Sequence, residues 1–148
     1  ILRDGQDVAM ICEGDPFFYG SFMYLFHRLT DEFTVEIIPG ISSLMACAGA
    51  GRTPLAARNE ILSVVPAPLG ETELRAAITQ ADTIAIIKLG RHAPKIHAIL
   101  EDLDLLDRAQ YVEHATMDSQ IVQPLREIDP ARAPYFAMIL VRKIGLTP

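Results

Sequence analysis

The sequence predicts an α/β protein of two small lobes, with a parallel-rich sheet in the first lobe and a mixed sheet in the second. Short apolar runs alternate with segments of helical periodicity, which is the pattern of parallel strands joined by helices. Glycine and proline clusters stand at the strand ends, and three further strand-like runs without long helices close the chain. Ligands of such sheets bind beyond the carboxyl ends of the strands, so a cleft between the lobes is the expected binding site.

The first lobe is predicted over residues 1–66. Its strands are expected where short apolar runs stop at turn residues, over 7–12, 33–38 and 60–65. A helix is expected between the first two strands, because five large apolar side chains there share one helical face: Phe18, Phe22, Leu25, Phe26 and Leu29. A second helix, made of small residues, is expected over 43–50, with Ser42 able to cap it.

The second lobe is predicted over residues 67–148, after a loop that contains Pro66, Pro68 and Gly70. Its first helix is expected over 71–80, where acidic residues occupy the first turn, as the helix dipole favours. The remaining elements are a helix over 94–103 and strands over 82–88, 110–113, 121–125 and 136–141.

Composition excludes several classes of function. The formal net charge of −6 argues against non-specific nucleic-acid binding, which requires a basic surface. No apolar run approaches the roughly 20 residues that span a bilayer, and residues 1–7 lack the pattern of a signal peptide. The two cysteines, Cys12 and Cys47, are expected to be buried free thiols, which fits a cytoplasmic protein. We therefore expect neither a nucleic-acid nor a membrane partner.

Three loops at strand ends combine residues that suit ligand binding. The first, 13–20, contains Gly14, which allows close backbone approach, and Asp15, which could equally be a helix N-cap. The second, 38–43, brings two hydroxyls to a helix N-terminus, where ordinary capping is the alternative. The third, 88–95, concentrates positive charge in an acidic chain, although a solvated surface cluster has the same composition.

No metal site is predicted, because the four histidines and two cysteines lack zinc spacing. The Walker A, GxSxG and GxGxxG motifs do not occur in the sequence. A Ser–His–acid triad stays open, although no nucleophile elbow supports one.

The order of these loops resembles the tetrapyrrole methylase family. Its members carry a GDPxxYG-like loop, then a VPGxSS-like loop and then a G-x-PL stretch, which here are residues 14–20, 38–43 and 52–55. Within the family, the chain is most similar to the precorrin-2 C20 methylases. Five segments carry that similarity: GDPFFYGSFMYLFHRL (14–29), PLAARNE (54–60), KLGRHAPKI (88–96), YVEHATM (111–117) and APYFAMILV (133–141). The cobalt-factor II C20 methylases of the oxygen-independent route are equally similar.

The resemblance implies a homodimer of two-lobed chains, each of which binds S-adenosylmethionine (SAM) in the cleft and releases S-adenosylhomocysteine (SAH). Transferred residue by residue, it implies these SAM contacts: Glu13, Gly14, Asp15, Phe18, Ser42, Ser43, Leu89, Ala115 and Pro134. Leu89 stands where the family often has methionine. The first glycine- and proline-rich loop of the family is absent, so we expect an N-terminal truncation, and the chain is expected to be inactive without that loop.

The implied reaction is methyl transfer from SAM to C20 of precorrin-2 in cobalamin (vitamin B12) biosynthesis. It is an in-line displacement that needs no covalent nucleophile, so positioning and water exclusion are the main tasks of the protein. Any catalytic base stays unidentified. Basic side chains at the strand ends are candidates to pair with the substrate carboxylates: Arg52, Arg58, Lys88, Arg91 and His92. The alternatives are another tetrapyrrole methylase, a relative that acts on a protein as the diphthine synthases do, and an inactive ligand-binding fragment.

Overall fold

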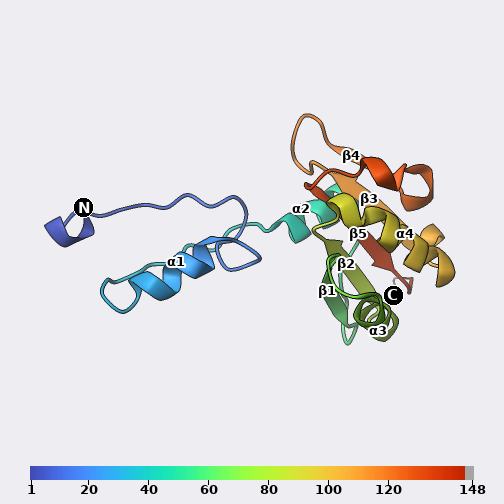
Figure 1. Ribbon diagram of the computed structural model, residues 1–148, viewed down its shortest axis with the longest axis horizontal. Coiled ribbons are helices and arrows are strands. Elements are labelled where there is room, and N and C mark those ends of the chain that lie inside the picture. The colour runs from blue at the N-terminus through green and yellow to red at the C-terminus, as the bar shows by residue number, and fades with distance from the viewer. Residues whose placement is uncertain (146–148) are drawn as a thin grey trace. The chain divides into compact units, whose positions relative to one another are not determined.

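The computed structural model describes residues 1–145, and these divide into two compact units, Ile1–Ser43 and a second that begins at Leu44. The second unit has the predicted α/β class, with one five-stranded mixed sheet (Figure 1). Its strands are β1 (Leu62–Pro66), β2 (Thr83–Ile87), β3 (Ala109–Glu113), β4 (Ile121–Pro124) and β5 (Ala137–Arg142). The helices of eight or more residues are α1 (Phe22–Leu29), α2 (Ser43–Ala50), α3 (Glu71–Gln80) and α4 (Ala93–Asp102). The predicted lobe boundary at residues 66/67 stays a prediction.

The sheet has the order β1-β2-β5-β3-β4. β1 and β2 run parallel, and β5 is antiparallel to both of its neighbours, β2 and β3. β2 and β3 therefore point in the same direction, so the carboxyl ends of β1, β2 and β3 lie at one edge of the sheet. This shared edge is where the predicted binding loops of the second unit are found.

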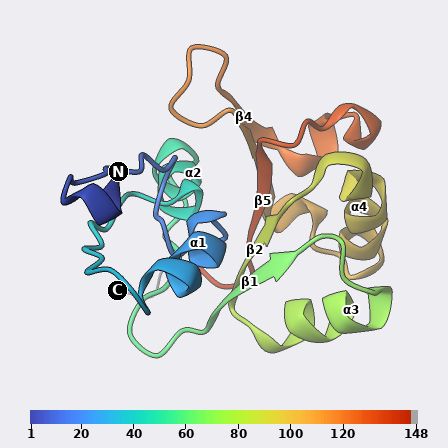
Figure 2. The ribbon, with the colours of Figure 1, turned by 60° about the vertical axis from the view of Figure 1, so that its left-hand side comes forward.

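Helices α3 and α4 cover one face of the sheet (Figure 2). The register places Ile84 opposite Val141 and Ile86 opposite Ile139, so their side chains share that face. They belong to a core cluster that includes fully buried residues of both helices, among them Leu74, Ile78, Ile96 and Leu100. Removal of a Leu or Ile side chain from such a core to alanine costs about 2–5 kcal/mol, so this layer holds the second unit together.

The opposite face of the sheet is crossed by the connection between α2 and β1, residues 52–60, which we name the strap. The hydroxyl of Thr53 donates to the side-chain oxygen of Gln110 on β3 at 2.8 Å. Farther along, Arg142 on β5 donates to the carbonyl of Pro54 at 3.0 Å and to both carboxylate oxygens of Glu60 at 2.9 Å. The strap is therefore fastened at both ends by side chains that point out of the sheet.

Two predicted strands do not form in the structure. Residues 7–12 and 33–38 have no strand assignment, and Val8, Ile11 and Ile38 are exposed. An apolar run becomes a strand only when a neighbouring strand completes its hydrogen-bond ladder, and within residues 1–145 no strand pairs with either segment. The parallel-rich sheet predicted for the first lobe is thus not seen among the described residues.

The first unit is organised instead around α1. Phe18, predicted to share the helical face, precedes the helix, while Phe22 and Phe26 lie on it. The ring of Phe17 packs edge-on against Phe26, with 4.9 Å between ring centroids, and lies 6.3 Å from that of Phe22. These aromatic contacts bring the first binding loop against the helix that follows it.

The two free cysteines differ in environment. Cys47 on α2 is buried as predicted, whereas Cys12 is only partly buried. Burial raises the pKa of the Cys47 thiol to about 11. Since the thiolate is the reactive form, the raised pKa makes Cys47 poorly reactive at pH 8.

We expect iodoacetamide at pH 8 to alkylate Cys12 at least tenfold faster than Cys47 in the folded chain, as measured by peptide mass spectrometry. Raising the pH towards 11 increases the thiolate fraction and accelerates the reaction of Cys47. Unfolding the chain in urea is the control, since it equalises the two rates. Equal rates in the folded chain would contradict the burial of Cys47.

Candidate functional site

Asp15 holds two of the predicted binding loops together in the first unit. Its carboxylate accepts hydrogen bonds from the backbone N–H of Phe17 at 2.9 Å and from that of Gly40 at 3.1 Å. The first bond closes a turn within loop 13–20, and the second reaches loop 38–43. Asp15 is therefore not the N-cap of α1, a position that Ser21 occupies. It connects the two loops.

Glycines allow these loops to approach each other backbone to backbone. Gly14 has φ +80°, in the left-handed region, and a Cβ built there would lie 3.5 Å from the carbonyl oxygen of Ile41 and 3.7 Å from the Cα of Ser42. A Cβ on Gly40 would overlap the carbonyl oxygen of Gly14. The structure thus brings together four predicted cofactor contacts, Gly14, Asp15, Ser42 and Ser43, with the exposed Glu13 and half-buried Phe18 in the same loop as Asp15.

A second group of predicted cofactor contacts gathers at the carboxyl edge of the sheet in the second unit. Leu89 follows β2, Ala115 follows β3 and Pro134 precedes β5 at the same edge. The backbone N–H of His114 donates to the carbonyl of Phe136 at 2.9 Å, which ties the loop after β3 to the start of β5. Three loops far apart in sequence therefore meet at one edge.

Unusual backbone conformations mark the same loops. Lys88, His114 and Thr116 all have positive φ, between 47° and 69°, although none is glycine. Such conformations cost of order 1–3 kcal/mol each and cluster at functional sites. Leu89 is fully buried, and its side chain packs in the core of the second unit.

The predicted substrate residues fall into two groups. Lys88, Arg91 and His92 lie in the loop after β2, where a 3-10 turn, Gly90–His92, leads into α4. Arg52 and Arg58 lie on the strap, and both are exposed with positive φ. The structure confirms neither group as a substrate site, and the two remain proposals.

His114 does not form a Ser–His–acid relay. Its Nδ1 lies 3.2 Å from the Ser119 hydroxyl and 3.6 Å from a carboxylate oxygen of Glu113, so both groups face the same ring nitrogen. A relay needs the serine and the acid on opposite nitrogens. Glu113 also accepts a hydrogen bond from the Tyr111 hydroxyl at 2.6 Å. Burial and then this hydrogen bond raise the pKa of Tyr111, so Tyr111 stays protonated at neutral pH.

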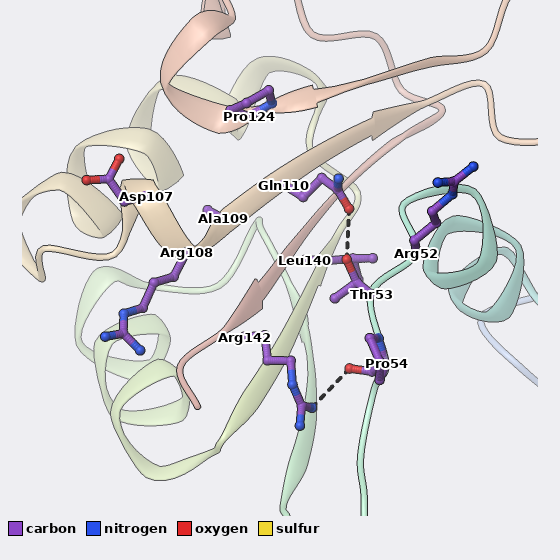
Figure 3. Close-up of a pocket in the computed structure, with 10 residues that line it drawn as sticks. All are labelled: Arg52, Thr53, Pro54, Asp107, Arg108, Ala109, Gln110, Pro124, Leu140 and Arg142. Carbon is purple, nitrogen blue, oxygen red and sulfur yellow. Dashed lines mark hydrogen bonds between the residues drawn. The ribbon is translucent and has the colours of Figure 1, made fainter. Parts of the chain in front are cut away.

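An open pocket of about 330 Å³ lies where the strap meets the sheet (Figure 3). It is lined by Arg52, Thr53, Pro54, Asp107, Arg108, Ala109, Gln110, Pro124, Leu140 and Arg142. Asp107 pairs with Arg126 outside the pocket, so arginine dominates the charge of the lining. Sequence reasoning found Arg52 but missed Arg108, Gln110 and Arg142, because no local motif links residues so far apart in the chain.

Two features are missing from the described part of the chain. Within residues 1–145, no three His, Cys, Asp or Glu side chains gather to hold a metal ion. None of the helices in this range has the length and apolar character to cross a membrane.

This combination of fold and loops is shared with known proteins. The tetrapyrrole (corrin/porphyrin) methylase family matches the chain over residues 2–129, and the chain therefore belongs to that family. It is 41% identical over 140 residues to a precorrin-2 C(20)-methyltransferase of Sinorhizobium sp., covering 95% of this chain and 57% of the relative. It is 31% identical over 144 residues to a cobalt-precorrin-2 C(20)-methyltransferase of Salmonella typhimurium, covering 96% and 61%. The chain thus spans about three fifths of these curated relatives.

Solved structures share the fold. A cobalt precorrin-4 methyltransferase, CbiF, matches with a TM-score of 0.74 at 23% identity, over 95% of this chain and 66% of that one. A uroporphyrin-III C-methyltransferase from Thermus thermophilus, solved with SAH, matches with a TM-score of 0.63 at 22% identity, over 88% and 63%. At these identities the likeness shows the fold alone, and it agrees with the α/β class predicted from the sequence.

Proposed function

We propose that this chain is part of a SAM-dependent methyltransferase that methylates C20 of precorrin-2 in cobalamin biosynthesis. The observation that carries the proposal is the 41% identity, spread over 95% of the chain, to a precorrin-2 C(20)-methyltransferase. The enzyme is proposed to act in the cytoplasm as a homodimer, with lobes over residues 1–66 and 67–148 and a cofactor cleft between them.

The residues of the two fastened loops fit SAM. The contact between Gly14 and Gly40 leaves no room for a Cβ on Gly40, which is typical of loops that present backbone groups to a ligand. Glu13, Gly14, Asp15, Phe18, Ser42 and Ser43 would hold the cofactor from the first unit, and Leu89, Ala115 and Pro134 from the second. Bound SAM supplies an electrophilic methyl group, and the chain contributes orientation and exclusion of water.

The basic residues are proposed to position the substrate through its carboxylates: Arg52, Arg58, Lys88, Arg91 and His92. Guanidinium groups bind carboxylates through paired, charge-assisted hydrogen bonds, which fix orientation as well as affinity. Since recognition depends on the local field, the net charge of −6 does not oppose it. No catalytic base is assigned.

Calorimetric titration of SAH into this chain tests the cofactor site. We expect micromolar binding, and absence of binding both here and in a chain extended to the length of its relatives would overturn the proposal. Turnover of the extended chain with ¹³C-methyl SAM then tests the reaction, with the methylated carbon read by NMR. Transfer to cobalt-factor II but not to precorrin-2 would favour the alternative with a cobalt-containing substrate, and the Salmonella typhimurium relative is named a cobalt-precorrin-2 C(20)-methyltransferase. SAH binding without any turnover would favour an inactive ligand-binding fragment.

Arg91→Ala is expected to raise the KM for the tetrapyrrole about tenfold in the extended chain, because one charge-assisted contact is lost. SAH affinity should stay within twofold, since Arg91 is not among the proposed cofactor contacts. Arg132→Ala removes the same charge from an exposed position in another loop and serves as the control. An unchanged KM in Arg91→Ala would identify the loop after β2 as ordinary surface.

A further inference from the structure

The pocket beneath the strap has an apolar floor and a positively charged rim. Ala109, Leu140 and the two prolines, Pro54 and Pro124, give it an apolar floor. In Figure 3, Arg52 lies on the strap side and Arg108 at the start of β3, with Gln110 and Leu140 between them. The two arginines thus lie on opposite sides of an apolar surface, and both guanidinium groups point outward from it.

The charges at this rim are not neutralised by the chain itself. The side chain of Arg52 makes no hydrogen bond or ion pair within residues 1–145, and only its backbone N–H is bonded, to the carbonyl of Gly49. Arg108 uses one nitrogen to donate to the carbonyl of Lys143, which leaves its other N–H groups for a ligand. The one acid in the lining, Asp107, is paired with Arg126. The rim therefore carries net positive charge on an acidic chain.

Two polar side chains of the lining, those of Gln110 and Arg142, also have donor groups that no described residue accepts. The side-chain oxygen of Gln110 accepts the hydroxyl of Thr53, so the amide nitrogen of Gln110 is left to donate. The Nε of Arg142 is buried without a hydrogen-bond partner in the described part of the chain. Buried donors of this kind are normally satisfied, so this one is an exception among the described residues.

We propose that this pocket binds one edge of a flat polycarboxylate, with carboxylates on Arg52 and Arg108 and the apolar body over the two exposed prolines, Pro54 and Pro124. The proposal rests on the proposed function, which supplies such a ligand: a tetrapyrrole whose rim carries acetate and propionate groups. Arg108 and Gln110 then join Arg52 as specificity-determining residues. The volume of about 330 Å³ suits one edge of the macrocycle.

Uroporphyrin III, a polycarboxylate tetrapyrrole, is a suitable probe, with binding followed by its fluorescence. We expect Arg52→Gln and Arg108→Gln each to weaken binding about tenfold, because each removes a charge-assisted pair. Arg132→Gln removes the same charge outside the pocket and should leave the Kd within twofold. Arg52→Gln is the decisive variant, since the Arg52 side chain has no hydrogen bond or ion pair among the described residues, so its loss should leave the melting temperature unchanged.

Failure to bind the porphyrin, or an unchanged Kd in Arg52→Gln, would overturn the proposal. The alternative ligand is a small free anion, for which inorganic phosphate is the probe. Displacement of the porphyrin by an equal concentration of phosphate would show that the pocket binds a small anion and would overturn the proposal. SAH titration of the same variants measures cofactor affinity and so tests the proposed function separately. Normal SAH binding with no porphyrin binding would overturn the pocket proposal alone, whereas absence of SAH binding both in this chain and in the extended chain would overturn the proposed function.

Discussion

Gly40→Ala is expected to weaken SAH binding by about tenfold to a hundredfold. The added Cβ would overlap the carbonyl oxygen of Gly14, and the next closest atoms are also backbone, so no side chain can move aside. Overpacking of this kind costs about 1–3 kcal/mol, and 1.4 kcal/mol corresponds to a factor of ten in Kd. The two loops would be forced apart at the point where Asp15 fastens them.

Gly49→Ala is the matched control for this experiment. It makes the same chemical change in α2, where a Cβ would meet nothing within 4 Å, so SAH affinity should be unaffected. Asp15→Ala provides a second variant, which removes the acceptor for the N–H groups of Phe17 and Gly40 without adding bulk. Normal SAH affinity in both Gly40→Ala and Asp15→Ala would show that these loops do not form the cofactor site.

Arg142→Met should lower the free energy of unfolding by about 3–5 kcal/mol, because it leaves the carboxylate of Glu60 buried without its charged partner. The side chains of Arg142 and Glu60 are only 11% and 14% exposed. Arg142 also donates to the carbonyl of Pro54 on the strap and to the Thr83 hydroxyl on β2, so its loss removes the bonds that hold the strap to β5. Urea denaturation followed by circular dichroism measures the change.

Arg75→Met is the comparison variant for Arg142→Met. Arg75 pairs with Glu71 and Asp102 on the surface, where such pairs contribute about 0–1 kcal/mol. The double variant Arg142→Met with Glu60→Gln should recover part of the lost stability, since no unpaired charge then stays buried. If Arg142→Met costs no more than Arg75→Met, the buried pair does not anchor the strap.

The sequence by itself predicts the positions of most helices and strands of the second unit. The helix over 71–80 was predicted with its observed bounds, as was α2 over 43–50, because their periodicity and turn residues are local signals. The five strands of the sheet lie within two residues of their predicted bounds for the same reason. Strands over 7–12 and 33–38 were predicted from equally apolar runs, but a strand also needs a partner, which a local pattern does not contain.

The candidate site divides in the same way. Gly14, Asp15, Ser42 and Ser43 could be named from their motifs, because each loop is continuous in sequence. The hydrogen bond from Gly40 to Asp15 and the pocket formed by Arg52, Arg108 and Gln110 were decided only by tertiary structure. These groups meet because loop closure and strand order bring distant segments together. The type of a residue does not determine which distant residue it will contact.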